Sequence, residues 1–100
     1  MTNFTPERLN QLSIEYDNLK ELNSKMIYAS VQGFPEGSEW ENKAAFDLTI
    51  QAMSGLMNCT GDPNGSPFKV GYAVTDVLAG LNMLQGIMAA VIHKERTGEG

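Results

Sequence analysis

The sequence predicts an α/β fold that is mostly helical, with one strand candidate and two long helices. Residues 25–31 form an apolar run whose length suits a strand covered on both faces, as in a parallel sheet. Apolar residues recur at helical spacing over about 44–59 and again over about 75–96. Because a single strand finds no partner within these 100 residues, we expect part of a larger α/β domain.

The residues before the strand predict two short helices. Thr5 is a favourable N-cap, Pro6 suits the first helical position and Glu7 favours the first turn. The helical pattern resumes over 15–22, and Asn23 follows it as a breaker. Helix, then strand, then loop is half of an α/β unit.

The helix expected over 44–59 depends on the spacing of its apolar residues. Phe46, Ile50, Met53 and Met57 follow one another at intervals of four, three and four residues. This spacing is typical of one face of an amphipathic helix.

The helix expected over 75–96 is apolar on most of its sides. Such a helix is normally buried, so we expect a domain larger than this chain to cover it. The apolar stretch approaches the length of a membrane span, but Asp76, Asn82 and Gln85 would be costly in lipid. A buried helix of a soluble protein, with no membrane partner, is therefore the expectation.

Composition and charge narrow the class of protein. A net charge of -5 without any basic run argues against nucleic acid or an anionic membrane as partner, since both need clustered cations. Cys59 is the one cysteine, so no disulfide can form within the chain and a reducing compartment is expected. The first twenty residues lack the apolar core of a signal peptide, so none is expected. We expect a cytoplasmic protein, with the mitochondrion or peroxisome as eukaryotic alternatives.

One histidine and one cysteine far apart provide no metal-ligand spacing, so no metal is expected.

Asp76 is the only acidic residue between Thr75 and Glu95, and the residues alone leave two interpretations of it open. A carboxylate in the first turn is stabilised by the unpaired backbone N–H groups there, so it can serve the helix end alone. That structural role is the commoner one. The same N–H groups would also keep the carboxylate ionised, which a nucleophile requires.

A series of short motifs runs along the whole chain. In order, they are Asn3-Phe4 with Pro6, then 26–30, 33–34, 45–47, 51–57, 60–63 and 70–71, then Thr75-Asp76 with Ala79-Gly80, and 93–100. They resemble the family III CoA-transferases, which include formyl-CoA and carnitine CoA-transferases and the related α-methylacyl-CoA racemases. The resemblance implies that residues 1–100 are an internal fragment of a Rossmann-like large domain, without the family's N-terminal part, glycine-rich loop and small domain.

The resemblance implies that Asp76 is the catalytic nucleophile of an acyl-CoA:carboxylate CoA-transferase. In the family this carboxylate attacks the acyl-CoA carbonyl to give a mixed anhydride, and CoA thiolate then forms an aspartyl-CoA thioester. The acceptor carboxylic acid resolves the thioester through a second anhydride and leaves as the new acyl-CoA. Covalent catalysis of this kind divides one difficult transfer into easier steps, and it needs no metal.

The resemblance also implies that two segments contact coenzyme A. These are Asn3, Phe4 and Thr5 in the first segment, and Ala44, Ala45, Phe46 and Asp47 in the second. At the position of Phe46, formyl-CoA transferases carry a tyrosine and the racemases a proton-shuttling histidine. Because Phe46 cannot transfer a proton, transfer is favoured over epimerisation. Family members form interlocked dimers, so a homodimer is expected.

Two alternatives to CoA transfer remain. One is an epimerase of the α-methylacyl-CoA racemase type, for which the substrate's α-carbon would exchange with solvent deuterium. The other is a truncated, non-catalytic fragment, because a piece without the glycine-rich loop and the small domain is not expected to turn over alone.

Overall fold

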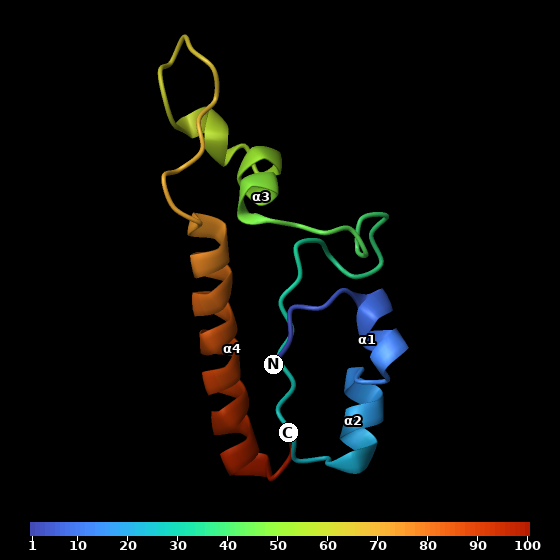
Figure 1. Cartoon of the computed structure of the whole chain (residues 1–100). Coiled ribbons are helices and arrows are strands. Elements are labelled where there is room, and N and C mark those ends of the chain that lie inside the picture. The colour runs from blue at the N-terminus through green and yellow to red at the C-terminus, as the bar shows by residue number, and fades with distance from the viewer.

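The structure, a computed structural model, describes residues 1–100 and contains four α-helices and one 3-10 helix. These are α1 (Pro6–Leu12), α2 (Tyr16–Leu22), α3 (Asp47–Met53), η1 (Leu56–Cys59) and α4 (Val74–Thr97). In Figure 1, α4 runs along one side, α1 and α2 lie on the other, and extended segments pass between them. Helix α3 lies near the start of α4 and is the only α-helix that comes close to it.

The two N-terminal helices form where the sequence predicts them. The Thr5 hydroxyl accepts a hydrogen bond from the Arg8 N–H at 3.4 Å, and Pro6 occupies the first turn. Ser13 ends α1 in the left-handed conformation, with φ of 55°, and its N–H bonds to carbonyls of the last turn. Leu9 is the one residue of α1 that is buried.

The strand expected over 25–31 is wrong as a complete strand, because no residue of the chain belongs to one. The segment is extended and forms a single parallel bridge, between Thr2 and Ser30. In this bridge the Thr2 N–H donates to the Ala29 carbonyl at 2.9 Å and the Val31 N–H to the Thr2 carbonyl at 3.1 Å. A parallel pair is what an α/β sheet requires, but further strands are not present among these residues. The β part of the predicted α/β class is thus represented by this one bridge, and about half of the chain is helical.

The helix expected over 44–59 is divided in two. Residues 44–46 are extended, so α3 begins at Asp47, and it ends at Met53. Gly55 then adopts φ of 79°, a conformation that glycine reaches without steric cost, and η1 follows. The apolar spacing continues across this break, which is why the periodicity alone predicts one long helix.

Helix α4 agrees with the helix expected over 75–96, but its surroundings do not. Gly98 ends it in the left-handed conformation, with φ of 80°. None of its residues is buried, whereas the sequence predicts a buried helix; Leu78, Leu81 and Leu84 are each about half exposed. By length and composition alone, α4 could cross a membrane.

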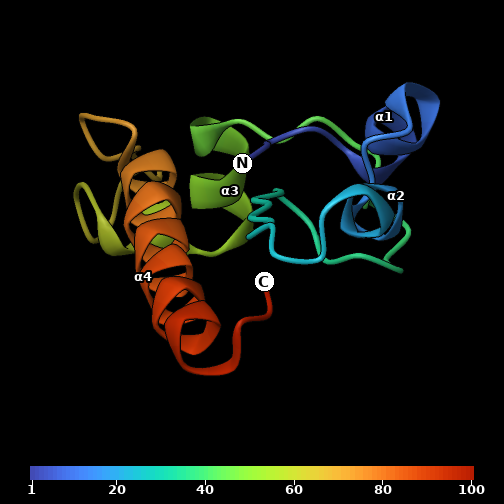
Figure 2. The same cartoon turned by 90° about the horizontal axis from the view of Figure 1, so that it is seen from below.

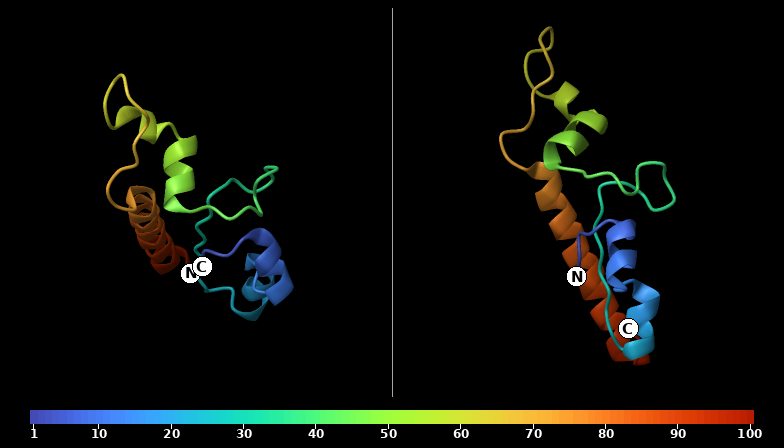
Figure 3. Two further views of the ribbon diagram at one scale, coloured as in Figure 1. Left: turned by 45° about the horizontal axis from the view of Figure 1, so that its top comes forward. Right: turned by 45° about the vertical axis from the view of Figure 1, so that its right-hand side comes forward.

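The chain buries very little of itself. It exposes 7386 Å², whereas a compact protein of this mass exposes about 5,600 Å². Its radius of gyration is 17.0 Å, against about 13 Å for a compact chain of 100 residues. Figure 2, seen along α4, shows α4 standing well apart from α1 and α2, and Figure 3 shows the loop after η1 projecting beyond the helices. The apolar faces therefore need cover from outside these residues.

Candidate active site

An open cavity of about 720 Å³ lies between the N-terminal segment, the extended segment before α3 and the first turns of α4. This volume is within the usual range of about 300–1,000 Å³ for small-molecule sites. Seven residues that the resemblance singles out line it: Asn3, Phe4, Thr5, Ala44, Ala45, Phe46 and Asp76. Three regions that are distant in the sequence thus meet at one cavity, and Asp76 is exposed to it.

Backbone pairing holds the N-terminal wall of the cavity. The bridge between Thr2 and Ser30 fixes the residues that follow Thr2, and Gln32 donates from its side-chain amide to the Phe4 carbonyl at 3.4 Å. The Glu7 N–H donates to the Asn42 side-chain oxygen at 2.9 Å, which ties the start of α1 to the loop before α3. These contacts tie the first segment and the residues on either side of it to residues 30–32 and 42, which precede the second segment.

Gly33 lies in close contact with Ala45, on the extended segment before α3. A Cβ atom built at Gly33 would collide with the Cβ of Ala45, so only a glycine fits beside Ala45 here. Both residues line the cavity. The position of the 44–46 segment therefore depends on the absence of a side chain at residue 33.

Asp47 joins the segment before α3 to the first turn of α4. Its carboxylate accepts hydrogen bonds from the Thr75 N–H at 2.9 Å and from the Thr75 hydroxyl at 2.8 Å. Helix α4 begins at Val74 and its own N-cap residue, Ala73, has no side-chain oxygen. Asp47 of α3 thus supplies the cap that the sequence around α4 lacks, and Asp76 follows in the same turn.

Gln51 completes this junction and is the only fully buried side chain in the chain. Its amide nitrogen donates to the Asp47 carboxylate at 2.6 Å and to the Tyr72 carbonyl at 3.4 Å, and its oxygen accepts from the Val70 N–H at 2.8 Å. One side chain therefore connects α3 to the segment that leads into α4.

The same contacts set the ionisation of Asp47. Burial of the carboxyl acts to raise its pKa, but hydrogen bonds from Thr75, Gln51 and the Asp76 backbone N–H outweigh burial, and the pKa lies below its ordinary value. Asp47 is thus ionised at neutral pH, next to the N-terminus of α4, where negative charge is stabilised.

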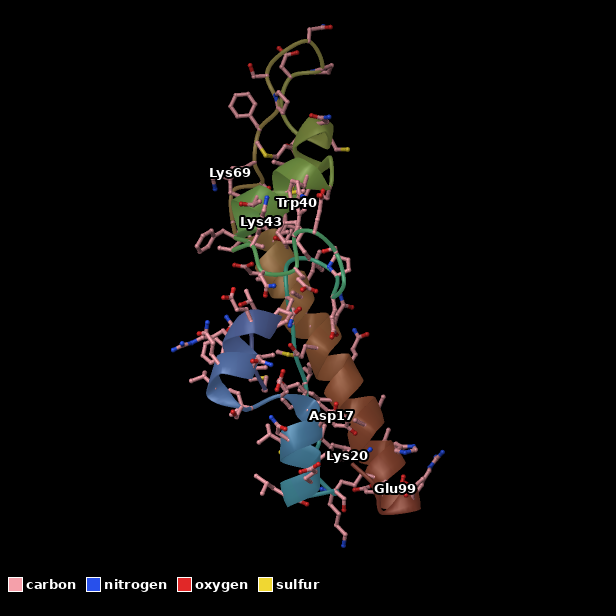
Figure 4. All side chains as sticks on the ribbon, turned by 90° about the vertical axis from the view of Figure 1, so that its right-hand side faces the viewer. Asp17, Lys20, Trp40, Lys43, Lys69 and Glu99 are labelled. Carbon is pink, nitrogen blue, oxygen red and sulfur yellow. The ribbon has the colours of Figure 1, made fainter.

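Two cations that the sequence did not single out also line the cavity. Arg8 comes from α1 and Lys43 from the segment before α3. The Lys43 ammonium lies over the Trp40 ring, 4.7 Å from its centroid, and Figure 4 shows the two side by side. Isolated cations in loops and short helices carry no sequence signal, which is why pattern reasoning missed them. The carboxylates of Glu41 and Asp76 line the same cavity and balance these two charges. Arg8 and Lys43 therefore offer individual contacts to a phosphate and not a positively charged cavity.

Asp47 is the one predicted site residue that does not line the cavity. Its two carboxylate oxygens are engaged by Thr75 and Gln51. The structure brings the other seven predicted residues together and places Asp47 behind them, at the α3–α4 junction.

Comparison with known proteins identifies the family. The whole chain, residues 1–100, matches the model of CoA-transferase family III, and the chain belongs to this family. The succinate–glutarate CoA-transferase of Agrobacterium fabrum is 41% identical over 98 residues, which are 98% of this chain and 24% of the relative. The formyl-CoA:oxalate CoA-transferase of Streptomyces coelicolor is 37% identical over 98% of this chain and 24% of its own length.

A solved structure of the same group agrees with the fold. The CaiB/BaiF family protein of Brucella suis superimposes with a TM-score of 0.90 at 37% identity, over 98% of this chain and 26% of that protein. The chain thus spans about a quarter of the length of the relatives it matches. Both relatives are named as CoA-transferases, and each matches this chain over nearly all of its residues.

The hydrogen bonds that the Asp47 carboxylate accepts from Thr75 and Gln51 are expected to stabilise the fold less in acid. In the folded chain, the pKa of the Asp47 carboxyl lies below its ordinary value. The ionised carboxylate therefore stabilises the fold fully at any pH above that ordinary value. The stabilisation is lost as the pH falls through the pKa of the folded state. The test uses a chimera in which this chain replaces the matching quarter of the Agrobacterium fabrum enzyme. The difference in free energy of unfolding between the chimera and its Asp47→Asn variant should shrink on acidification. A difference that stays constant with pH would contradict this assignment.

Substitution of Gly33 should distort the cavity. In the chimera, Gly33→Ala brings a methyl group into collision with Ala45, and relief of such overpacking costs about 1–3 kcal/mol. We expect both a lower denaturation midpoint and a higher KM for acyl-CoA, since the 44–46 segment must move. Gly71→Ala is the matched control, because a Cβ there meets nothing within 4 Å. Equal behaviour of the two variants would show that Gly33 has no special role.

Proposed function

We propose that residues 1–100 form the nucleophile-bearing part of an acyl-CoA:carboxylate CoA-transferase, with Asp76 as the nucleophile. The observation that carries this proposal is the cavity itself, where Asp76 faces two segments that the family resemblance associates with coenzyme A. The remaining machinery belongs to the rest of the large domain, and the enzyme acts as a homodimer.

Asp76 performs the covalent step. Its carboxylate oxygen attacks the acyl carbonyl of the donor, and CoA thiolate leaves to give an aspartyl anhydride. The thiolate then attacks the aspartyl carbonyl, releases the donor acid and leaves CoA joined to Asp76 as a thioester. The acceptor carboxylate attacks the carbonyl of that thioester and expels CoA thiolate, which gives a second aspartyl anhydride. The thiolate then attacks the acceptor's acyl carbonyl, and the new acyl-CoA leaves with Asp76 restored as a carboxylate. Asp76 lies in the first turn of α4, at the end of the helix where a negative charge is stabilised.

The other cavity residues have simpler roles in this proposal. Phe4 and Phe46 offer exposed rings for packing against the apolar parts of coenzyme A. Arg8 and Lys43 supply cations for its phosphates. Since the names of the relatives include succinate, glutarate and oxalate, a small dicarboxylic acid is the acceptor to test first.

Trapping the covalent intermediate tests the proposal. The chimera is mixed with succinyl-CoA and treated with borohydride or hydroxylamine, and the peptide containing Asp76 is identified by mass spectrometry. The expected result is a mass change confined to Asp76, which is absent without acyl-CoA. Modification of a different residue, or none at a time when transfer is under way, would overturn the assignment.

A second measurement separates transfer from epimerisation. Phe46 cannot carry a proton, so the α-carbon of a 2-methylacyl-CoA should not exchange with solvent deuterium in the chimera. Exchange that depends on Asp76 would instead favour the epimerase.

A further inference from the structure

The contacts at the α3–α4 junction converge on the turn that carries Asp76. The Asp47 carboxylate binds both the N–H and the hydroxyl of Thr75, the residue immediately before Asp76. The Thr75 hydroxyl also lies 3.4 Å from the Asp47 carbonyl. No other side chain caps this end of α4. The orientation of the Asp76 side chain on α4 therefore depends on Asp47, a residue of α3.

A nucleophile needs this kind of support, because displacement of about 1 Å can cost on the order of 10²-fold in rate. Helix ends fray unless their free N–H groups are satisfied, and Ala73 has no oxygen to do so. Gln51 holds the carboxylate from its other side at 2.6 Å and is itself completely buried. Asp47 thus has little freedom to move, and neither has the turn that it binds.

We propose that Asp47 is a positioning residue for Asp76: with Gln51 and Thr75, it fixes the first turn of α4 so that the Asp76 carboxylate faces the acyl carbonyl. This inference rests on the proposed function, since it presumes that Asp76 is the nucleophile. It moves Asp47 from the set of residues that contact coenzyme A to a supporting role behind the cavity.

The readout must separate positioning from stability. A purely structural contact, when lost, reduces the fraction of folded enzyme, which lowers the amplitude of adduct formation at saturating succinyl-CoA. A positioning contact lowers the single-turnover rate constant of the folded enzyme, with little change in KM for succinyl-CoA. Rapid quenching of the chimera, followed by mass spectrometry of the adduct, measures both quantities.

Three variants probe the contact from different sides. Asp47→Ala removes the acceptor, and we expect the rate constant to fall on the order of 10²-fold. Asp47→Asn retains an oxygen for Thr75 but turns an amide group toward the Gln51 amide nitrogen, so two donors face each other. The double variant Asp47→Asn with Gln51→Glu exchanges the amide and the carboxylate and restores the donor–acceptor pair between positions 47 and 51. It also removes the donor to the Tyr72 carbonyl and places a charge in a buried position, so we expect it to recover only part of the rate lost in Asp47→Asn. Thr75→Val keeps the N–H contact and should lose less than Asp47→Ala.

Controls keep the inference separate from the proposed function. Asp17→Asn makes the same chemical change on α2, which Figure 4 shows far from Lys43 and Trp40, and should leave the rate unchanged. If the adduct still forms in Asp76→Ala, the proposed function fails. If Asp76 is required but Asp47→Asn and Thr75→Val both react at the original rate constant, only the positioning role fails. Should Asp47→Ala give no folded enzyme, these two milder variants decide.

Discussion

Replacement of Asp76 by alanine is expected to abolish CoA transfer in the chimera. In the proposed mechanism the side chain removed is the one that forms both anhydrides and the thioester, so no partial reaction should survive. Loss of a covalent nucleophile can cost on the order of 10⁶-fold in kcat, and the residual rate should equal that of buffer. Because the Asp76 side chain is exposed, the fold should be little affected. Steady-state transfer from succinyl-CoA to glutarate measures the effect.

Asp76→Asn sharpens this result. The amide has nearly the same shape as the carboxylate but is a very poor nucleophile, so it should be as inactive as alanine while coenzyme A still binds. Substantial transfer by either variant, above the buffer rate, would exclude Asp76 as nucleophile and leave the helix-capping interpretation of its charge.

Gln51→Leu is expected to cause the largest loss of local stability in the chain. The leucine fills a similar volume but leaves the partly buried Val70 N–H and one oxygen of Asp47 without their partner. Loss of its partner costs a backbone N–H such as that of Val70 about 1–3 kcal/mol when water cannot replace the partner. Amide hydrogen exchange over 69–76 in the chimera should accelerate by roughly 5–150-fold per group lost.

Gln85→Leu is the matched control for this change. Gln85 lies on α4, and its side chain is exposed and makes no hydrogen bond within the chain. Its replacement should leave exchange over 69–76 unchanged. If Gln51→Leu also leaves exchange unchanged, the junction between α3 and α4 does not depend on the Gln51 amide.

The elements predicted best are those whose signals are local. Thr5 and Pro6 start α1 through contacts within one turn, and the apolar stretch after Thr75 defines α4 to within a residue at each end. The strand over 25–31 fails for the opposite reason. A strand exists only through its neighbours, and the single partner available is Thr2. The break at Gly55 was missed because apolar spacing continues through it.

Some residues of the candidate site could be selected from the sequence and others could not. Resemblance of motifs was enough to select seven residues that the structure gathers around one cavity. The role of Asp47 could not be read from the sequence, because its partner Thr75 is 28 positions away and no periodic pattern connects the two. Gln51 was equally hidden, since a glutamine on a short helix normally faces solvent.

The walls of the cavity come from regions that are held together by only a few hydrogen bonds. A substrate lying across all three would therefore act as a cross-link, and its binding free energy would be coupled to the ordering of the protein. When its concentration is 100 times the dissociation constant, such a ligand adds about 2.7 kcal/mol to the stability of the assembled form. Acyl-CoA would then be a stabiliser as well as a reactant, and the enzyme would be most susceptible to proteolysis when its substrate is depleted.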